Sequence, residues 1–162
     1  MSPERVPHLK GPVHESKPGV VFSGGYYLKS VDEGKHWQGP FYPPSVPKES
    51  FINPYGQPLP AYNRGAMVEG SDGRLFWVCA ANECLTPRRA ATHLMISEDK
   101  GQSWHYSCPV ATDAEVTFSE TSIHETPNGD LVAFMRTNNF EDQACIARST
   151  DGGKSFQPWQ GM

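Results

Sequence analysis

Three octapeptides of one pattern constrain the fold of this 162-residue chain more than any other feature. They begin at Ser30 (SVDEGKHW), Ser97 (SEDKGQSW) and Ser149 (STDGGKSF), and each reads Ser-x-Asp-x-Gly-x-x-aromatic. Ser and Asp side chains hydrogen-bond nearby backbone groups and Gly tolerates a positive φ, so each octapeptide predicts a hairpin turn. Three such turns in one small chain indicate a repeat architecture. We call these segments the three octets.

The repeat is larger than the octets. Gly73 and Gly129 are 129 − 73 = 56 residues apart, and this offset aligns GSDGRLFWVC with TPNGDLVAFM. The later copy contains four extended runs, which predict one four-stranded antiparallel sheet. These runs are residues 121–125, 130–137, 144–149 and the segment that begins at Lys154.

Units of about 50 residues with four strands each are typical of β-propeller blades. We therefore predict an all-β chain of about two and a half to three blades, which form an incomplete ring. Blade remnants are expected at 19–40, 61–110 and 118–160, within a partial propeller over 19–162 that follows an irregular segment, residues 1–18. The open sheet faces allow three alternatives: a portion of a longer protein, self-association that completes a ring, or a short protein that pairs half-propellers.

Composition excludes several classes of partner. The 14 basic and 18 acidic residues give a net charge of −4, which offers no basic footprint for nucleic acid. No segment approaches the roughly 20 apolar residues of a membrane span. Residues 1–18 contain no apolar segment of the kind found in signal peptides, so we expect none in this chain.

The cysteines and histidines do not predict a metal site. Cys79 and Cys84 have C-x4-C spacing without a second pair, and no histidine lies in a ligand motif. Cys79 and Cys145 fall in predicted strands, where a buried free thiol is the expected state. We expect neither a metal nor an organic cofactor, and the pattern gives no support for a disulfide that involves any of the four cysteines, including Cys108.

The segment from Glu120 to Arg136, ETSIHETPNGDLVAFMR, carries a more specific pattern. It resembles the blade of the sialidase (neuraminidase) superfamily that reads E-[NT]-x-[IV]-x-E-x-x-[DN]-G-x-[LV]-x-x-x-x-R. The octets are similar to the Asp boxes of the same superfamily, whose fold is a six-bladed propeller. Because those boxes lie at the rim of the propeller, the resemblance implies structural roles for Asp32, Asp99 and Asp151.

The resemblance implies that Glu120 is the base for a tyrosine nucleophile and that Arg136 is one of three arginines that bind the carboxylate of sialic acid. Tyrosine has a pKa near 10 and needs an adjacent base to attack, as in the sialidases, which depart from the two-carboxylate rule of glycosidases. Arginine presents a planar fork that matches a carboxylate. Without the surrounding pattern, a glutamate and an arginine at strand ends would more often be a surface ion pair.

Arg64 lies at the position equivalent to Glu120, since 120 − 64 = 56. We expect it to point toward the central axis, either as a contact to substrate or as a structural partner for a carboxylate such as Glu120. Tyr62 is placed similarly and is a weaker candidate for substrate binding.

The first hypothesis is a sialidase-like glycoside hydrolase of the exo-α-sialidase type, which cleaves terminal sialic acid or a related acidic sugar from glycans. The superfamily's first arginine and acid/base aspartate would precede this chain, and its tyrosine and third arginine would follow it, so we expect the chain alone to be inactive. The second hypothesis is a non-catalytic propeller module that binds glycan or protein. Sialidases are often secreted or periplasmic, but the sequence does not assign a compartment.

Overall fold

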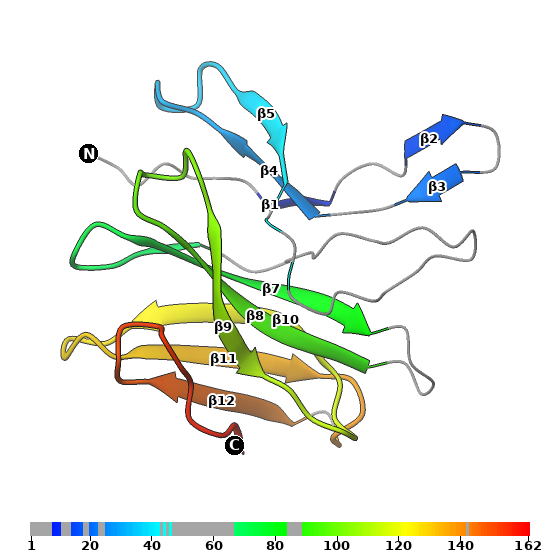
Figure 1. The fold of residues 1–162 in the computed structure, drawn as a ribbon, viewed down its shortest axis with the longest axis vertical. Helices are drawn as coiled ribbons and strands as arrows, with labels where there is room; N and C mark the ends of the chain where they lie inside the picture. Colours follow the sequence, from blue (N-terminus) through cyan, green and yellow to red (C-terminus); the bar gives the residue numbers. More distant parts are fainter. Residues whose placement is uncertain are drawn as a thin grey trace.

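The structure, a computed structural model, describes residues 8–10, 14–17, 20–22, 25–42, 44, 46, 67–83, 89–141 and 143–162. In these ranges every regular element is a β-strand, and the strands form four antiparallel sheets (Figure 1). The sheets do not close into a ring among the described residues, as the all-β, incomplete-propeller prediction requires. The same residues contain no helix long and apolar enough to cross a membrane.

The described N-terminal part forms strands both before and along the first predicted blade remnant, residues 19–40. The strands are β1 (His8–Lys10), β2 (His14–Lys17), β3 (Val20–Phe22), β4 (Gly25–Lys29) and β5 (Gln38–Phe41). They form a three-stranded sheet in the order β1-β4-β5 and a separate β2-β3 hairpin. Residues 1–18 were predicted to be irregular, whereas β1 and β2 lie there. Strand pairing is made by backbone groups, so a short polar strand can pair without showing an apolar pattern.

The middle sheet has the order β6-β7-β8-β9 and the last sheet the order β10-β11-β12-β13. The middle strands are β6 (Val68–Glu69), β7 (Leu75–Glu83), β8 (Arg89–Ser97) and β9 (His105–Ala111). The last strands are β10 (Phe118–Glu125), β11 (Leu131–Thr137), β12 (Ala144–Ser149) and β13 (Gln160–Gly161). Both are the four-stranded antiparallel units that the repeat predicted.

The fourth strand of the last sheet was predicted to begin at Lys154 and instead begins at Gln160. The backbone N–H groups of Lys154 and Ser155 both donate to the Asp151 carboxylate, so they belong to the octet turn. Pro158 has no N–H to donate to a strand ladder. Gln157 N–H already donates to the carbonyl of Arg148 in β12 over 2.8 Å, but the regular strand pairing starts only at Gln160.

The offset of 56 residues aligns two turns with the same geometry. Gly73 and Gly129 both have φ of +83°. Gly73 N–H donates to the carbonyl of Gly70 over 3.0 Å, and Gly129 N–H donates to the carbonyl of Thr126 over 2.9 Å. The alignment of the two sheets, made on these glycines, is therefore confirmed.

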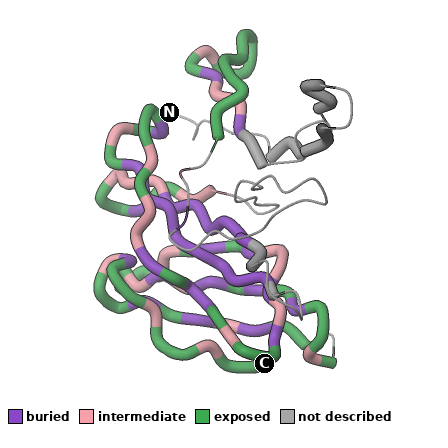
Figure 2. Tube along the Cα trace, turned by 45° about the vertical axis from the view of Figure 1, so that its right-hand side comes forward, coloured by how far each residue is buried: buried purple, intermediate pink, exposed green. Residues whose placement is uncertain are grey.

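The main core lies between the middle and last sheets, which stack face to face (Figure 1). Phe76 and Leu94 of the middle sheet and Phe118, Leu131 and Met135 of the last are fully buried there. A second cluster joins the first sheet to the middle one. In it the rings of Tyr27, Trp77 and Trp104 meet edge to face. Figure 2 shows the buried residues concentrated along the strands of the middle and last sheets.

Each octet is held by its own Asp carboxylate. In the third, Ser149 Oγ donates to Asp151 Oδ1 over 2.8 Å, and Gly153 N–H donates to Ser149 Oγ over 3.0 Å. Ser155 Oγ donates to Asp151 Oδ2 over 2.5 Å. The octets at Ser30 and Ser97 repeat these contacts at the same positions, with the ring of His36 in place of the last hydroxyl in the first octet.

The octet glycine is also the point where one sheet meets the next. The carbonyl of Gly153 accepts a hydrogen bond of 2.7 Å from Ser107 Oγ of the middle sheet. A Cβ at Gly153 would lie 2.7 Å from Leu94 Cδ2 of the same sheet. In the second octet the carbonyl of Gly101 accepts a 3.4 Å hydrogen bond from Tyr27 of the first sheet. The second and third octet turns thus pack on the sheet before them.

We predict that Gly153→Ala destabilises the chain more than Gly129→Ala does. The φ angles are +86° at Gly153 and +83° at Gly129. Either substitution therefore forces an L-residue into a left-handed conformation, at about 1–2 kcal/mol. A Cβ at Gly129 would meet no atom within 4 Å, whereas one at Gly153 would clash with Leu94, which adds about 1–3 kcal/mol. Urea unfolding of both variants measures the difference; equal losses would contradict the close packing described at Gly153.

We also predict that the octet carboxylates make stability depend on acid pH. The Ser103 hydroxyl holds the pKa of Asp99 well below its ordinary value of 3.8, and the Ser155 hydroxyl does the same for Asp151. A lowered pKa in the folded state contributes stability that is complete above the ordinary value and is lost as the pH falls through the lowered one. Asp151→Asn should therefore have a lower Tm than the wild type at pH 7. The difference between the two Tm values should become smaller as the pH falls from roughly 5 to 2.

The control for this measurement is Glu98→Gln, which removes the same charge from the second octet outside its network of turn hydrogen bonds. Its Tm should follow that of the wild type at every pH. If Asp151→Asn showed the same pH profile as Glu98→Gln, the octet carboxylates would not be the source of the acid sensitivity.

Candidate functional site

The candidate site lies where β10 begins and β11 ends. The register pairs Phe118 with Thr137 and Thr121 with Met135, so two residues of β10, Ser119 and Glu120, face one residue of β11. This is a β-bulge, which inserts an extra residue and redirects side chains. Phe118 and Thr121 are both buried although they are three residues apart, while Ser119 and Glu120 both lie on the more open side. The bulge thereby brings the side chain of Glu120 to that of Arg136.

Glu120 and Arg136 form an ion pair. Arg136 Nη1 donates to Glu120 Oε2 over 2.9 Å, and the exposed fractions of the side chains are 63% for Arg136 and 31% for Glu120. The hydrogen bond from Arg136 lowers the pKa of Glu120 from 4.5 to about 2, with a further contribution from Ser119. Glu120 is therefore fully ionised at neutral pH, and a large part of the Arg136 side chain faces solvent.

Ser119 is a third member of the site that the sequence did not single out. Its Oγ lies 2.9 Å from Glu120 Oε2, 3.3 Å from the carbonyl oxygen of Arg136 and 3.2 Å from Asn138 Oδ1. A hydroxyl has one proton to donate, so these acceptors share it. The sequence shows only the dipeptide Ser-Glu at the start of a strand. The contact between the two side chains depends on a bulge, which the apolar pattern does not predict.

The loop after Arg136 is fixed to the start of β10. Asn138 N–H donates to the carbonyl of Thr117 over 3.1 Å, and Thr117 N–H donates to Asn139 Oδ1 over 2.7 Å. Thr137 Oγ1 donates to the carbonyl of Gln143 over 2.9 Å across the base of the loop. These contacts hold the two strand ends together and so support the ion pair.

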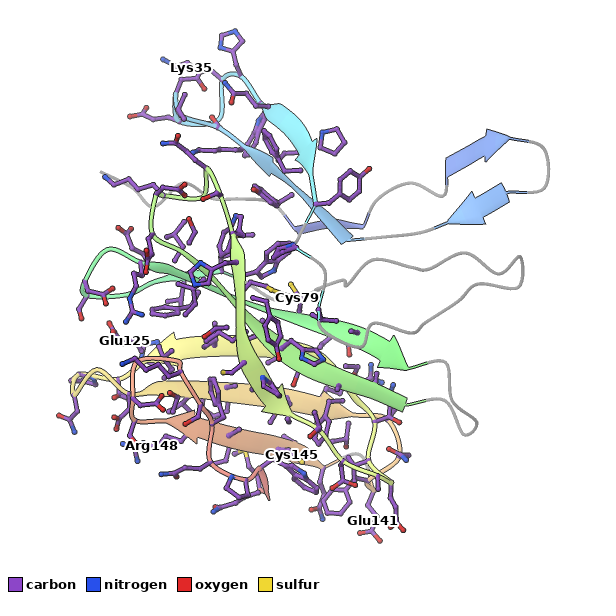
Figure 3. The ribbon with its side chains drawn as sticks, in the orientation of Figure 1. Lys35, Cys79, Glu125, Glu141, Cys145 and Arg148 are labelled. Carbon is purple, nitrogen blue, oxygen red and sulfur yellow. The ribbon has the colours of Figure 1, made fainter. Side chains whose placement is uncertain are left out.

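A second carboxylate–guanidinium pair lies at the other end of the same strands. Arg148 of β12 donates from Nε to Asp130 Oδ2 over 3.0 Å, and its Nη2 donates to the same oxygen. Figure 3 shows Arg148 at one end of the last sheet and Glu141, in the loop that follows Arg136, at the other. The two pairs are separate, which makes Asp130 and Arg148 natural controls for Glu120 and Arg136.

Two of the predicted binding residues, Tyr62 and Arg64, lie outside the described residues, as does Cys84. Their proximity to Glu120 stays a prediction. Cys79, Cys108 and Cys145 are buried, and burial raises the pKa of Cys108 to about 11. Within the described ranges no group of three or more His, Cys, Asp or Glu side chains could hold a metal ion.

The proteins that this chain resembles have folds consistent with the one described above. Residues 13–161 match the family model of the BNR repeat-like domain. No curated protein matches the chain. A protein of unknown function from Dyadobacter fermentans is 52% identical, with a TM-score of 0.82, over 96% of this chain and 41% of that one.

Two enzymes share the fold at lower identity. The NanB sialidase of Streptococcus pneumoniae is 18% identical with a TM-score of 0.60, over 98% of this chain and 25% of its own. A polysaccharide lyase described as an ulvan lyase is 15% identical with a TM-score of 0.55, over 98% of this chain and 39% of its own. The chain thus spans less than half the length of each of these proteins. The suspected relationship to the sialidase superfamily is confirmed for the fold, and the chain belongs to the BNR repeat-like domain family.

Proposed function

We propose that this chain forms part of a sialidase-like site of the exo-α-sialidase type, which hydrolyses terminal sialic acid or a related acidic sugar from glycans. The observation that carries the proposal is the Glu120–Arg136 pair, which a β-bulge assembles at 2.9 Å from two strand ends. The Arg136 side chain is 63% exposed, which is not expected of a buried structural pair. Exposure leaves Arg136 accessible to a ligand carboxylate.

The roles follow from the chemistry of the two groups. Arg136 binds the sugar carboxylate through parallel N–H donors, which fixes the orientation of the ring. Glu120 accepts the proton of a tyrosine supplied from outside residues 1–162, and the neutral tyrosine attacks without the repulsion that an anionic nucleophile would meet. Arg64 and Tyr62 are proposed as further contacts to the sugar.

Another sheet would complete the site. Phe134, on the open face of the last sheet, is 44% exposed, whereas Val78, its equivalent at an offset of 56 residues, is buried beneath the last sheet. This difference supports a further blade on that face, either from a longer polypeptide or from a second copy of the chain. The blade would bring residues that Glu120 and Arg136 need for catalysis.

One observation favours the second hypothesis, a non-catalytic module that binds acidic glycans. Glu120, with a pKa of about 2, is a weak base while it is paired with Arg136. A site that only binds would need Arg136 and would make no use of a base. Turnover separates the two functions.

A longer protein that contains this chain should hydrolyse a fluorogenic sialoside. In that protein Glu120→Gln should lower kcat by at least about 100-fold, the usual scale for the loss of a general base. Arg136→Ala should raise KM and lower kcat, because it removes the contact that orients the sugar. Steady-state kinetics measures both effects.

The control is Asp130→Asn, which breaks the pair at the opposite end of the sheet and should leave kcat and KM unchanged. Turnover unaffected by both Glu120→Gln and Arg136→Ala would rule out the site assignment. Sialoside binding that depends on Arg136, without turnover, would support the binding module instead.

A further inference from the structure

A ligand carboxylate that approaches Arg136 meets a competitor in the protein itself. Glu120 already occupies one nitrogen of the guanidinium, Nη1, at 2.9 Å. Arginine binds carboxylates best through two parallel N–H donors, so a ligand that uses the N–H of Nη1 now bonded to Glu120 has to displace that carboxylate. A ligand that uses the remaining N–H groups places a second negative charge beside Glu120. In either case the ligand weakens the pairing of Glu120 with Arg136.

We propose that the Glu120–Arg136 ion pair is a lock that an anionic ligand opens: ligand binding at Arg136 releases Glu120 to act as a base, while Ser119 keeps Glu120 in place. The proposal rests on the proposed function, because it gives Arg136 and Glu120 the roles stated there. It adds that the two roles are coupled and do not operate independently.

The geometry makes this pair exchangeable. Arg136 contacts Glu120 through a single nitrogen, and more than half of its side chain is exposed, so it can turn toward a ligand without leaving a buried cation unpaired. The control pair is built differently, since Arg148 approaches Asp130 with two nitrogens. Two hydrogen bonds have to break to separate Arg148 from Asp130, whereas one has to break to separate Arg136 from Glu120.

Ser119 keeps Glu120 aligned when Arg136 leaves. Its hydroxyl lies 2.9 Å from the same oxygen, Glu120 Oε2, and it is on the same strand, so the contact does not depend on where the guanidinium points. The bulge fixes both residues on the more open side of β10. Ser119 is therefore a positioning residue, which acts through Glu120.

Coupling of this kind is reciprocal. If a bound anion weakens the hold of Arg136 on Glu120, then removal of the Glu120 charge must strengthen anion binding at Arg136 by the same factor. The direction of the pKa change of Glu120 follows as well. Arg136 lowers this pKa, so a ligand that draws Arg136 away raises it toward the ordinary value of 4.5. A stronger base thus forms only when an acidic ligand is present.

The first test measures binding of N-acetylneuraminic acid, by NMR titration at pH 7, to the longer protein that contains this chain, which is the protein used for the kinetic test. Glu120→Gln should bind it about 5-fold or more tightly than the wild type, within the usual range of coupling between two sites. Asp130→Asn, the matched control, should bind like the wild type. The methyl ester of N-acetylneuraminic acid, which has no charge on its carboxyl group, should not distinguish Glu120→Gln from the wild type.

The second test follows the carboxyl carbon of Glu120 in protein labelled with ¹³C-glutamate. Arg136→Gln should raise the pKa of Glu120 from about 2 toward 4.5, and Arg148→Gln should not. Saturating N-acetylneuraminic acid should shift the wild-type titration in the same direction as Arg136→Gln. Ser119→Ala should raise the pKa of Glu120, and Ser119→Thr, which retains the hydroxyl, should restore it.

Each outcome decides between the lock and the proposed function. Equal or weaker binding by Glu120→Gln, with binding abolished in Arg136→Ala, overturns the lock and leaves the proposed site standing. Wild-type binding by Arg136→Ala, or no binding by any of the proteins, overturns both. A titration of Glu120 that does not respond to Ser119→Ala overturns the positioning role of Ser119.

Discussion

The stacking of one sheet on the next through the octet glycine is the contact on which the rest of the structure depends. At Gly153 the backbone approaches Leu94 so closely that no side chain fits, and its carbonyl is held by Ser107 of the preceding sheet. The Asp151 carboxylate keeps this glycine in its left-handed conformation, because it accepts hydrogen bonds from the Ser149 hydroxyl and from the backbone N–H of Lys154, on either side of the glycine. A polar turn at the rim thereby fixes the spacing of two apolar sheet faces, and the core of Phe76, Leu94 and Leu131 forms between them.

That stacking also accounts for a difference between the middle and last sheets at the position of Arg136. The positions of the last sheet that match Phe76 and Val78 of the middle sheet are Val132 and Phe134, by the offset of 56 residues. In the middle sheet this face is covered, so its strand ends carry apolar or small residues such as Ala80. Arg136 replaces Ala80 at the equivalent place in the last sheet, where the face is open. A charge is tolerated there because it can be solvated and paired.

The sequence predicted the regular part of this structure well and its irregular part poorly. The well-predicted features depend on local residue chemistry, which the sequence displays directly. They are the octets, the turns at Gly73 and Gly129, and the strand from Ala144 to Ser149. The bulge at Ser119 and Glu120 depends on which residues become buried, and the three residues of β1 show no apolar pattern that would predict their pairing with β4. The last strand begins at Gln160 because Asp151 holds Lys154 and Ser155 in the turn. Glu120 and Arg136 were identified from a family resemblance, while Ser119, which no motif includes, required the structure.

The two ion pairs of the last sheet differ in their number of hydrogen bonds and in the exposure of their carboxylates. Arg148 donates from two nitrogens to Asp130 beside the octet turn, and the exposed fraction of the Asp130 side chain is 17%. Arg136 donates from one nitrogen to Glu120, whose exposed fraction is 31%, at the end of the sheet where Ser119 offers the carboxylate an alternative partner. An exposed single-contact pair contributes little to stability, because solvent screens it. Its cost of separation is correspondingly small, and that low cost is the property a site requires if a ligand is to take the arginine.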